Sequence, residues 1–364
     1  MPCRPAAPLP ALALFALAML LGAAAPAAAQ DQQTRQLDTF SALDIGGPYD
    51  VVFDTGAAQT VLLSDQRSLF DDVELTVRNA TLFVRPRHTL SYYLPFGQTQ
   101  HGLTVHIQLP RLHRVASNGS GQIDLHGLRG GVLELALNGS GDLRASGAVA
   151  DLSVTNNGSG NTDLRALPAS TATVQLRGSG DIALTGIERQ LQADVSGSGN
   201  LTVTGVRAAG IDLALRGSGD ITLTGNATAL SADLHGSGNL LACGLALRRV
   251  SLQQDGSGDA CVAGTISQFD AQLRGTGNLR ASGLQAPSLR LRISGAGMAQ
   301  LAGSGGTLSA DLTGSGDLDG RDLLVRQADV RVRGSGTALV SVKASDGGAA
   351  RPTQFDRNGA HGDD

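Results

Sequence analysis

The sequence predicts an all-β protein, a parallel β-helix (β-solenoid) with coils of about 19–20 residues. The first observation behind this prediction is a Gly-Ser-Gly triplet, altered once to Gly-Thr-Gly and once to Gly-Ala-Gly, that recurs twelve times. The second is its spacing, because the step from one first glycine to the next alternates between 20 and 19, with these glycines at positions 119, 139, 158, 178, 197, 217, 236, 256, 275, 295, 314 and 334. A fixed period of this size indicates stacked repeats rather than one globular core.

The third observation is that each repeat supplies two short strands and two corners. Apolar residues alternate with polar ones before the triplet, as at 191–196, and after it, as at 201–203, and this period of two is typical of strands. A second glycine usually follows eight positions after the first, as at Gly205 and Gly225. Stacked coils pair their backbone amides and cover each other's apolar faces. A narrow interior of Leu, Ile, Val and Ala suits a chain with no Trp and 3% aromatic residues.

The residue after the triplet alternates between Asp and Asn. With one coil of about 19–20 residues, each Asp lies between two Asn, so that carboxylates are about 10 Å apart and repel each other little. Asp and Asn also hydrogen-bond to backbone amides in turns, and we interpret these residues as a structural turn ladder. The alternative is one large coil of about 39 residues, which would stack Asp directly on Asp. The ladder comprises Asp142, Asn161, Asp181, Asn200, Asp220, Asn239, Asp259 and Asn278.

Four segments are expected in order along the chain. Residues 1–29 read as a signal peptide, because the apolar run 9–22 is followed by Ala27-Ala28-Ala29, a small-residue cleavage site. Residues 30–118 lack the repeat but carry strand-like runs, and we predict irregular capping coils continuous with the solenoid of 119–342. Residues 343–364 are polar and Gly-rich, which predicts a disordered tail. No later stretch is apolar enough to span a bilayer, and the last coil needs a cover or a partner, which makes a homo-oligomer an expectation.

Two local features are candidate sites. The segment 91–97 carries Tyr92, Tyr93 and Phe96; it is either a partner-binding loop or a plug of the stack. Cys243 and Cys261 fall on outward positions of neighbouring coils, and an oxidising compartment permits a disulfide. Their two-residue offset, however, places the Cα atoms near or beyond the usual limit of about 7 Å, so that two unbridged surface cysteines are the alternative.

Few other sequence patterns indicate catalysis or the binding of a cofactor, a metal or nucleic acid. The triplet serine directly follows the first glycine, which does not match a nucleophile elbow, and no phosphate loop or dinucleotide fingerprint is present. We predict no catalytic, cofactor or metal site, since His101, His106, His113 and His126 lack the pairing of zinc-binding helices. The formal net charge of −4, with no basic run among aromatic residues, argues against nucleic acid as a partner.

Two functional alternatives remain open. Solenoids of this shape include polysaccharide-cleaving enzymes, and six outward aspartates are candidates for an acidic site: Asp194, Asp212, Asp233, Asp270, Asp311 and Asp329. The structural alternative is that these aspartates lie on solvated strand faces, where arginines balance their charge. These arginines are Arg177, Arg216, Arg274, Arg292, Arg331 and Arg333. A calcium-stabilised extracellular scaffold is the other alternative, since Gly-rich coils ending in Asp can bind this ion.

Several motifs resemble a known bacterial family. They are FSALDIGGPYDV at 40–51, Thr55-Gly56, IQLPRL at 107–112 and NGSG at 118–121, followed by the repeats. In order and spacing they resemble the putative autotransporter adhesin family with the head GIN domain, over about residues 36–343. The resemblance implies a secreted or envelope-associated β-helical protein and brings no catalytic residues. We therefore expect an exported, non-enzymatic, adhesin-like binding or structural scaffold, periplasmic or at the cell surface, with an envelope protein or glycan as partner.

Overall fold

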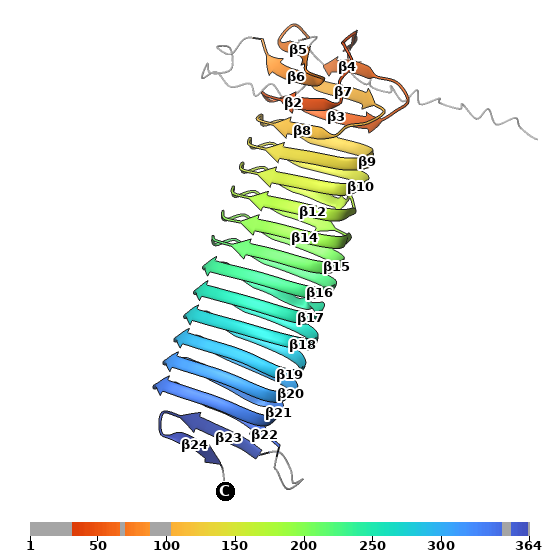
Figure 1. Ribbon diagram of the computed structural model, residues 1–364. Helices are drawn as coiled ribbons and strands as arrows, with labels where there is room; N and C mark the ends of the chain where they lie inside the picture. The colour runs from red at the N-terminus through yellow and green to blue at the C-terminus, as the bar shows by residue number, and fades with distance from the viewer. Residues whose placement is uncertain (1–30, 66–69, 88–102, 344–350, 363–364) are drawn as a thin grey trace, which may run out of the picture.

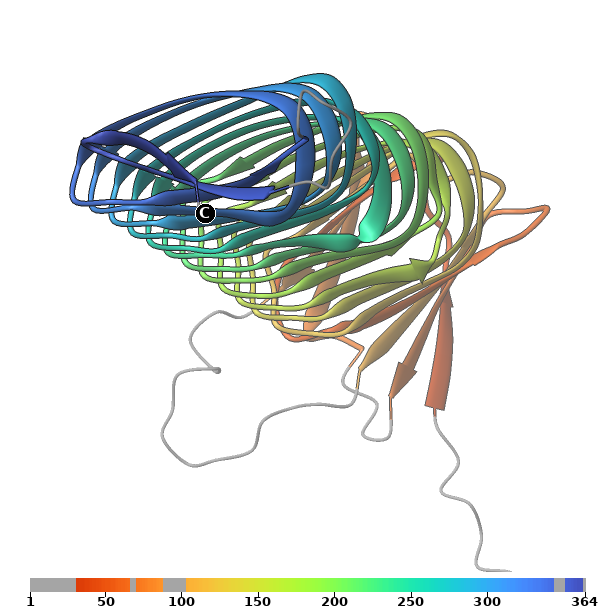
Figure 2. The ribbon, with the colours of Figure 1, turned by 90° about the horizontal axis from the view of Figure 1, so that it is seen from below.

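The chain forms a rod of stacked coils. The computed structural model describes residues 31–65, 70–87, 103–343 and 351–362, and their strands join one continuous sheet wound into a β-solenoid of about 11 turns. Figure 1 shows the coils stacked from the N-terminal cap to the C-terminal end, and Figure 2 shows them superposed along the rod axis around a narrow interior. The all-β solenoid predicted from the triplet spacing is confirmed.

From residue 123 onward, the repeats form parallel coils. Two coils are each split into two strands, whereas most others run as one long strand that bends at its corners. In chain order these strands are β9 (Ile123–Leu137), β10 (Leu143–Asn156), β11 (Thr162–Ala166), β12 (Ala169–Leu176), β13 (Ile182–Thr185), β14 (Ile187–Val195), β15 (Leu201–Leu215), β16 (Ile221–Gly236), β17 (Leu240–Gly256), β18 (Ala260–Gly275), β19 (Leu279–Gly295), β20 (Met298–Gly314), β21 (Asp317–Gly334) and β22 (Ala338–Val342).

The strand register gives the length of one coil. Thr202 of β15 pairs with Thr222 of β16, and Thr222 pairs with Leu241 of β17. The sequence number thus advances by 20 and then by 19, which are the same steps as those between triplets. One coil therefore spans a single triplet repeat, and the alternative of a large coil made of two repeats is wrong.

Alternation along each strand builds the core. Ile211, Leu213 and Leu215 of β15 point inward and are at most 5% exposed, whereas Asp212 between them is exposed. Several polar side chains are also buried, among them the amides of Asn156 and Gln254. The side-chain amide of each donates to the carbonyl of the last glycine of the following triplet, Asn156 at 2.8 Å. A buried carbonyl that would otherwise lack a partner is satisfied in this way.

The triplet glycines permit close approach of neighbouring coils. A Cβ added at Gly158 would collide with the carbonyl oxygen of Gly139 in the preceding coil, and one at Gly178 would meet Gly158 in the same way. The serine between the glycines points outward, as the exposed Ser159 shows. At the two glycines of each triplet, the backbones of neighbouring coils thus come too close for any side chain.

The N-terminal cap combines parallel and antiparallel pairing. Its strands are β1 (Asp31–Arg35), β2 (Ala42–Ile45), β3 (Asp50–Thr55), β4 (Thr60–Asp65), β5 (Val73–Arg78), β6 (Thr81–Pro86), β7 (Thr104–Leu109) and β8 (Arg114–Ser117). The stack continues upward through β8, β2 and β6 on one side and through β3 and β7 on the other, all parallel. Antiparallel β5 then closes the first side, and antiparallel β4 and β1 close the second. Antiparallel strands end the parallel stack at this end of the rod.

The expected disordered tail is wrong for residues 351–362. This segment forms an antiparallel hairpin of β23 (Arg351–Asp356) and β24 (Gly359–Gly362), which pairs with β22 and lies against the end of the rod (Figure 1). The physical reason is Phe355, which pairs with Ala338 and packs against the core. Phe355 therefore anchors the hairpin to the end of the rod. A single large apolar residue in a polar segment is too short a pattern to predict a hairpin from sequence.

Candidate functional site

The eight ladder residues lie in one column along the rod. The backbone N–H of each later member donates to Oδ1 of the member one coil before it, as from Asn161 to Asp142 at 2.8 Å and from Asp181 to Asn161 at 3.0 Å. The same bond recurs up to Asn278, at 2.8–2.9 Å. Each side chain therefore provides the acceptor for the turn above it, which fixes the register of neighbouring coils.

The alternation of Asp and Asn has a further consequence within the column. Asn200, Asn239 and Asn278 each also donate their side-chain Nδ2 to Oδ1 of the aspartate below, at 2.9–3.0 Å. Asp181, Asp220 and Asp259 thus each receive two hydrogen bonds, and no ladder carboxylate lies one coil away from another. Within the part of the chain that the structure describes, no group of three or more His, Cys, Asp or Glu side chains is arranged to hold a metal ion.

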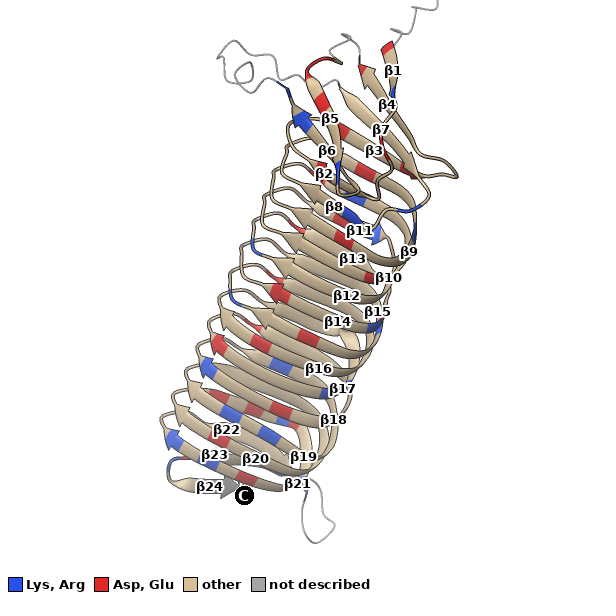
Figure 3. Ribbon diagram, turned by 45° about the horizontal axis from the view of Figure 1, so that its top comes forward, with Lys and Arg blue, Asp and Glu red and all other residues tan. Residues whose placement is uncertain are grey.

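The six outward aspartates lie on the strand face that precedes the triplets, but spread over many coils. Several are paired with basic groups: Asp194 with Arg216 at 2.9 Å, Asp233 with His235 at 2.9 Å, and Asp311 with Arg333 at 3.7 Å. Asp329 pairs with Arg331, and Asp212 accepts a hydrogen bond from Gln190. Figure 3 shows acidic and basic residues interspersed along the rod. This face is a mixed charged surface.

Two Asp-x-Arg pairs stand out electrostatically. Arg165 donates from Nη2 to Oδ2 of Asp163 at 2.6 Å and from Nε to Oδ1 at 2.9 Å. These hydrogen bonds lower the pKa of Asp163 to about 2, against the desolvation that opposes the shift. Arg321 lowers the pKa of Asp319 by the same arrangement near the other end of the rod. Both carboxyls are held ionised, which suits a surface ion pair rather than a proton donor.

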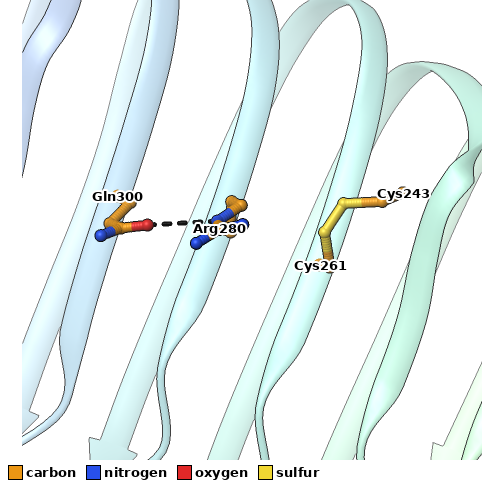
Figure 4. The surroundings of a disulfide bond; sticks show 4 residues. All are labelled: Cys243, Cys261, Arg280 and Gln300. Carbon is orange, nitrogen blue, oxygen red and sulfur yellow. Dashed lines mark hydrogen bonds between the residues drawn. A yellow bond between two sulfur atoms is a disulfide. The ribbon is translucent and has the colours of Figure 1, made fainter.

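A disulfide joins the two outward cysteines. Cys243 and Cys261 are bridged, with their Cα atoms 5.2 Å apart (Figure 4). The Cα atoms are closer than the sequence offset suggests because the register breaks at this point: Ala242 pairs with Val262, but the next paired residue of β17 is Ala246. The extra residues form a bulge that carries Cys243 back towards Cys261. Bulges redirect side chains in this way.

Beside the disulfide lies a shallow hollow of about 540 Å³. We call it the disulfide hollow. It is lined by Leu241, Asp259, Ala260, Cys261, Asn278, Leu279, Arg280, Met298 and Gln300. Leu241 is 46% exposed and Met298 39%, although most large apolar side chains of the described chain are buried. Arg280 lies between them in the stack and donates to Gln300 at 3.1 Å (Figure 4). The hollow therefore offers apolar surface next to a cation.

The sequence analysis did not select this hollow, although it contains a signal. Leu241 stands in a column where other coils carry Thr202, Thr222 and Arg280, and Met298 takes the place that Asp or Asn holds in the ladder. An exposed large apolar residue at a position that is polar in most coils is informative, because nothing in the fold buries it.

Two other hollows lie between the second glycine corner of each coil and the strand segment that leads to the next triplet. One, of about 520 Å³, includes Arg249, Arg290, Asp212 and Asp270, and the other, of about 670 Å³, includes Arg207 and Arg248. Both expose charged and small polar side chains. They differ from the disulfide hollow in presenting no exposed large apolar residue.

The remaining residues that the sequence analysis selected lie on separate elements or fall outside the residues that the structure describes. Tyr92, Tyr93, Phe96 and His101 lie outside the described residues, as does the signal-peptide segment 1–29. Of the other histidines, His106 lies in β7 and His126 in β9, while His113 precedes β8. In the described ranges, no helix is long and apolar enough to cross a bilayer.

Comparison with known proteins agrees with the repeat architecture. The model of the family described as "Putative auto-transporter adhesin, head GIN domain" matches residues 39–206, 187–284 and 264–349, which together span most of the chain. The chain belongs to this family. The overlapping matches show that the head GIN family model fits successive stretches of the same repeat array. No protein of curated function matches this family member.

Solved structures of low identity share long alignments with this head GIN family member. One, a putative adhesin from Bacteroides fragilis, is 16% identical, with 76% of this chain and 98% of that chain covered and a TM-score of 0.29. A putative adhesin from Parabacteroides distasonis is 17% identical, with coverages of 86% and 97% and a TM-score of 0.32. A protein from the same species named a putative lipid binding protein is 14% identical, with coverages of 85% and 95% and a TM-score of 0.33.

Proposed function

We propose that this chain is an exported, non-enzymatic scaffold of the bacterial cell envelope that binds an envelope protein or glycan in the manner of an adhesin. Membership of the head GIN family supports the adhesin-like role. The apolar run 9–22 with its small-residue cleavage site supports export to the periplasm or the cell surface. The stacked coils supply a rigid rod, which suits display of a contact surface rather than closure around a substrate.

The disulfide hollow is the contact surface that we assign to this role. The observation that carries the assignment is the exposure of both Leu241 and Met298 in one hollow, on a rod most of whose large apolar residues fill its interior. Binding would remove both side chains from water, and Arg280 between them would orient a polar or anionic group of the partner. The disulfide at the edge of the hollow holds two of the coils that line it in fixed register.

Pairing of the outward carboxylates supports a non-enzymatic role. A polysaccharide-cleaving site needs one carboxyl that keeps its proton near neutral pH and a second that is ionised. Asp163 and Asp319, by contrast, have pKa values shifted downward by their arginine partners. Asp194 and Asp311 lie within ion-pair distance of an arginine.

Binding by the purified chain tests the proposal. The mature chain, residues 30–364, would be immobilised and exposed to labelled vesicles of the producing bacterium's envelope and to an array of its glycans. Replacing both Leu241 and Met298 by Ser should weaken binding about thirtyfold, because each lost apolar contact is worth roughly 1 kcal/mol.

The matched control is Val132→Ser, since Val132 of β9 is 61% exposed but lies far from the disulfide hollow in the stack. Its binding should equal that of the unchanged protein. Equal loss in both variants, or retained binding in the Leu241 and Met298 variant, would remove the hollow from the proposal. Failure of the unchanged chain to retain any envelope component would contradict the binding function itself.

A further inference from the structure

The corner that begins at the second glycine of each coil carries positive charge over part of the rod. Arg207, Arg248 and Arg249 are the charged residues of this corner in strands β15–β20, and the corner contains no Asp or Glu there. Its segments are 205–210, 225–229, 244–249, 264–268, 283–288 and 303–307. Outside this stretch the corner also carries acidic residues, namely Glu188 in β14 and Asp322 in β21. The positive charge of the stretch is therefore not balanced at the corner itself.

The hollow of about 670 Å³ lies in this stretch, and we call it the arginine hollow. Its lining comes from β15, β16, β17 and β18, with Arg207 in the first of these strands and Arg248 in the third. The coils that carry the two arginines are two steps apart in the stack, about 10 Å. Residues 226–228 of β16 line the hollow between them, and these side chains are short. Two guanidinium groups can therefore reach a ligand that lies over β16.

Both guanidinium groups are available to such a ligand. The side chains of Arg207 and Arg248 are exposed, and neither forms an ion pair or a hydrogen bond with a residue that the structure describes. The hollow of about 520 Å³ differs, because its Arg290 lies beside Asp270 in the strand register. The fork of N–H donors on an unpaired arginine matches carboxylate, phosphate and sulfate groups. The arginine hollow therefore suits anionic groups.

The other exposed side chains of the hollow are short and polar. They are Asn226 and Thr228 of β16 and Thr265 and Ser267 of β18. Ser267 donates its hydroxyl to the backbone carbonyl of Arg248 at 3.2 Å and keeps its oxygen as an acceptor. Amide and hydroxyl groups donate and accept hydrogen bonds, and the hydroxyl groups of a sugar need both kinds of partner.

The lining also disfavours two other classes of ligand. None of the exposed large apolar side chains of the described chain lies in the hollow, whereas such side chains form the centre of most protein interfaces. The lining contains no aromatic side chain on which a nucleic-acid base could stack. Charge and hydrogen-bonding groups together favour a sugar chain with anionic substituents.

We infer that the arginine hollow binds an acidic sugar chain, whose anionic groups contact Arg207 and Arg248 and whose hydroxyl groups contact the polar side chains beside them. The sugar chain lies along the rod, because the hollow extends over four neighbouring coils, about 14 Å. The inference rests on the proposed binding function and names the chemical class of one ligand. It does not use the disulfide hollow, which is lined by the strands that follow the triplets.

Fluorescence anisotropy tests the inference with residues 30–364 and a labelled oligogalacturonate, an oligosaccharide whose sugars each carry a carboxylate. The unchanged chain should bind this probe, and added salt should weaken binding. The uncharged methyl ester of the probe should bind at least about tenfold more weakly. Arg207→Gln and Arg248→Gln should each weaken binding about tenfold, because each removes a charge-assisted contact. Thr228→Tyr should also weaken binding without a change of charge, because the larger side chain fills the space between the arginines.

The matched control is Arg177→Gln, which removes the same charge from an exposed arginine at a triplet corner and should leave binding unchanged. Thermal melting of each variant checks that the fold is retained. The inference is overturned by equal binding of the methyl ester, or by an equal loss in Arg177→Gln. Binding of polyglutamate in place of the oligosaccharide would indicate a protein partner and would also overturn it.

The experiment separates this inference from the proposed function. The double variant Leu241→Ser, Met298→Ser should bind oligogalacturonate as the unchanged chain does. A chain that retains envelope vesicles but not oligogalacturonate overturns the inference and leaves the proposed function standing. A chain that binds neither contradicts both.

Discussion

The backbone N–H and the side-chain Nδ2 of Asn200 both donate to the same oxygen, Oδ1 of Asp181 in the preceding coil, at 2.8 and 3.0 Å. Asn200 in turn accepts the backbone N–H of Asp220 at 2.9 Å. An asparagine can act as acceptor and donor at once, whereas a carboxylate can only accept. The alternation therefore places an asparagine, which donates and accepts, next to each aspartate, which only accepts.

Replacing Asn200 by Asp should destabilise the rod at neutral pH. The change keeps the acceptor for Asp220, but it removes the Nδ2 donor and puts a carboxylate between Asp181 and Asp220 at one-coil spacing. We expect a loss of roughly 1–2 kcal/mol, seen as a melting temperature a few degrees lower. Asp181→Asn is the matched control, since it keeps the acceptor without adding charge and should change the melting temperature little.

The same variant should show a distinctive pH dependence. Crowding raises the folded-state pKa of its carboxylates above the unfolded values, so that the folded state binds more protons. Relative stability is then lost as the pH rises through the raised folded pKa and regained on acidification. A deficit in melting temperature that stays constant from pH 7 to pH 4 would show that repulsion in the column is not the cause.

A second prediction concerns the close approach at the triplets. Gly158→Ala should cost several kcal/mol or prevent folding, because its Cβ would collide with the carbonyl of Gly139. Gly210→Ala is the matched control, since no heavy atom lies within 4 Å of a Cβ at that site and no positive φ is required there. Thermal unfolding of both variants measures the difference. Equal effects at the two sites would contradict the close-approach account of the triplet.

The disulfide should stabilise the rod without being required for its fold. It joins residues 18 positions apart, and closing a loop of that size stabilises by about 3 kcal/mol in the chain-entropy picture. Replacing both Cys243 and Cys261 by Ser should lower the melting temperature while leaving the β-sheet circular dichroism spectrum unchanged. Reductant should lower the melting temperature of the unchanged protein similarly and leave the double variant unaffected. A reductant effect on the variant would point to a cause other than this bridge.

The Asp163–Arg165 pair predicts a modest acid sensitivity. The folded-state pKa of Asp163 lies at about 2, below the ordinary value of about 4. Its stabilisation is present above about pH 4 and is lost as the pH falls towards 2. Because Arg165 is 68% exposed and Asp163 is 33% exposed, solvent screens the pair, and we expect Asp163 to contribute less than about 1 kcal/mol. Asp163→Asn should therefore lose less stability than the unchanged protein between pH 5 and pH 2.

The control for this measurement is Asp255→Asn, an exposed aspartate of β17 that forms no ion pair with a described residue. It should leave the acid sensitivity unchanged. If Asp163→Asn and Asp255→Asn behave alike, the arginine pair contributes nothing to the acid response.

Much of the fold could be predicted because the solenoid repeats its local pattern. The coil length, the inward Leu and Val columns and the role of the triplet all follow from residues that recur at one period. The cap could not be predicted in detail, because its antiparallel strands β1, β4 and β5 occur once each and have no repeat to reveal their partners. The C-terminal hairpin depends on a single anchor, Phe355.

The candidate site was less accessible to sequence reasoning for a related reason. Its signal is a deviation from the repeat, with Leu241 and Met298 on columns that are polar in most coils, and such a deviation gains meaning only when the coil register is known. The spacing of Cys243 and Cys261 similarly depends on a bulge that sequence offset alone does not show.

The stacking of neighbouring coils underlies the ladder and the disulfide hollow, and one distance tests it most directly. Thr202 and Arg280 lie in one column, and successive residue pairs link them through four coil steps. Spin labels at these two positions, in a chain whose native cysteines are replaced by serine, should be about 19 Å apart by electron paramagnetic resonance. A distance of about 10 Å would indicate coils of twice the length, and one beyond about 40 Å would contradict stacking altogether.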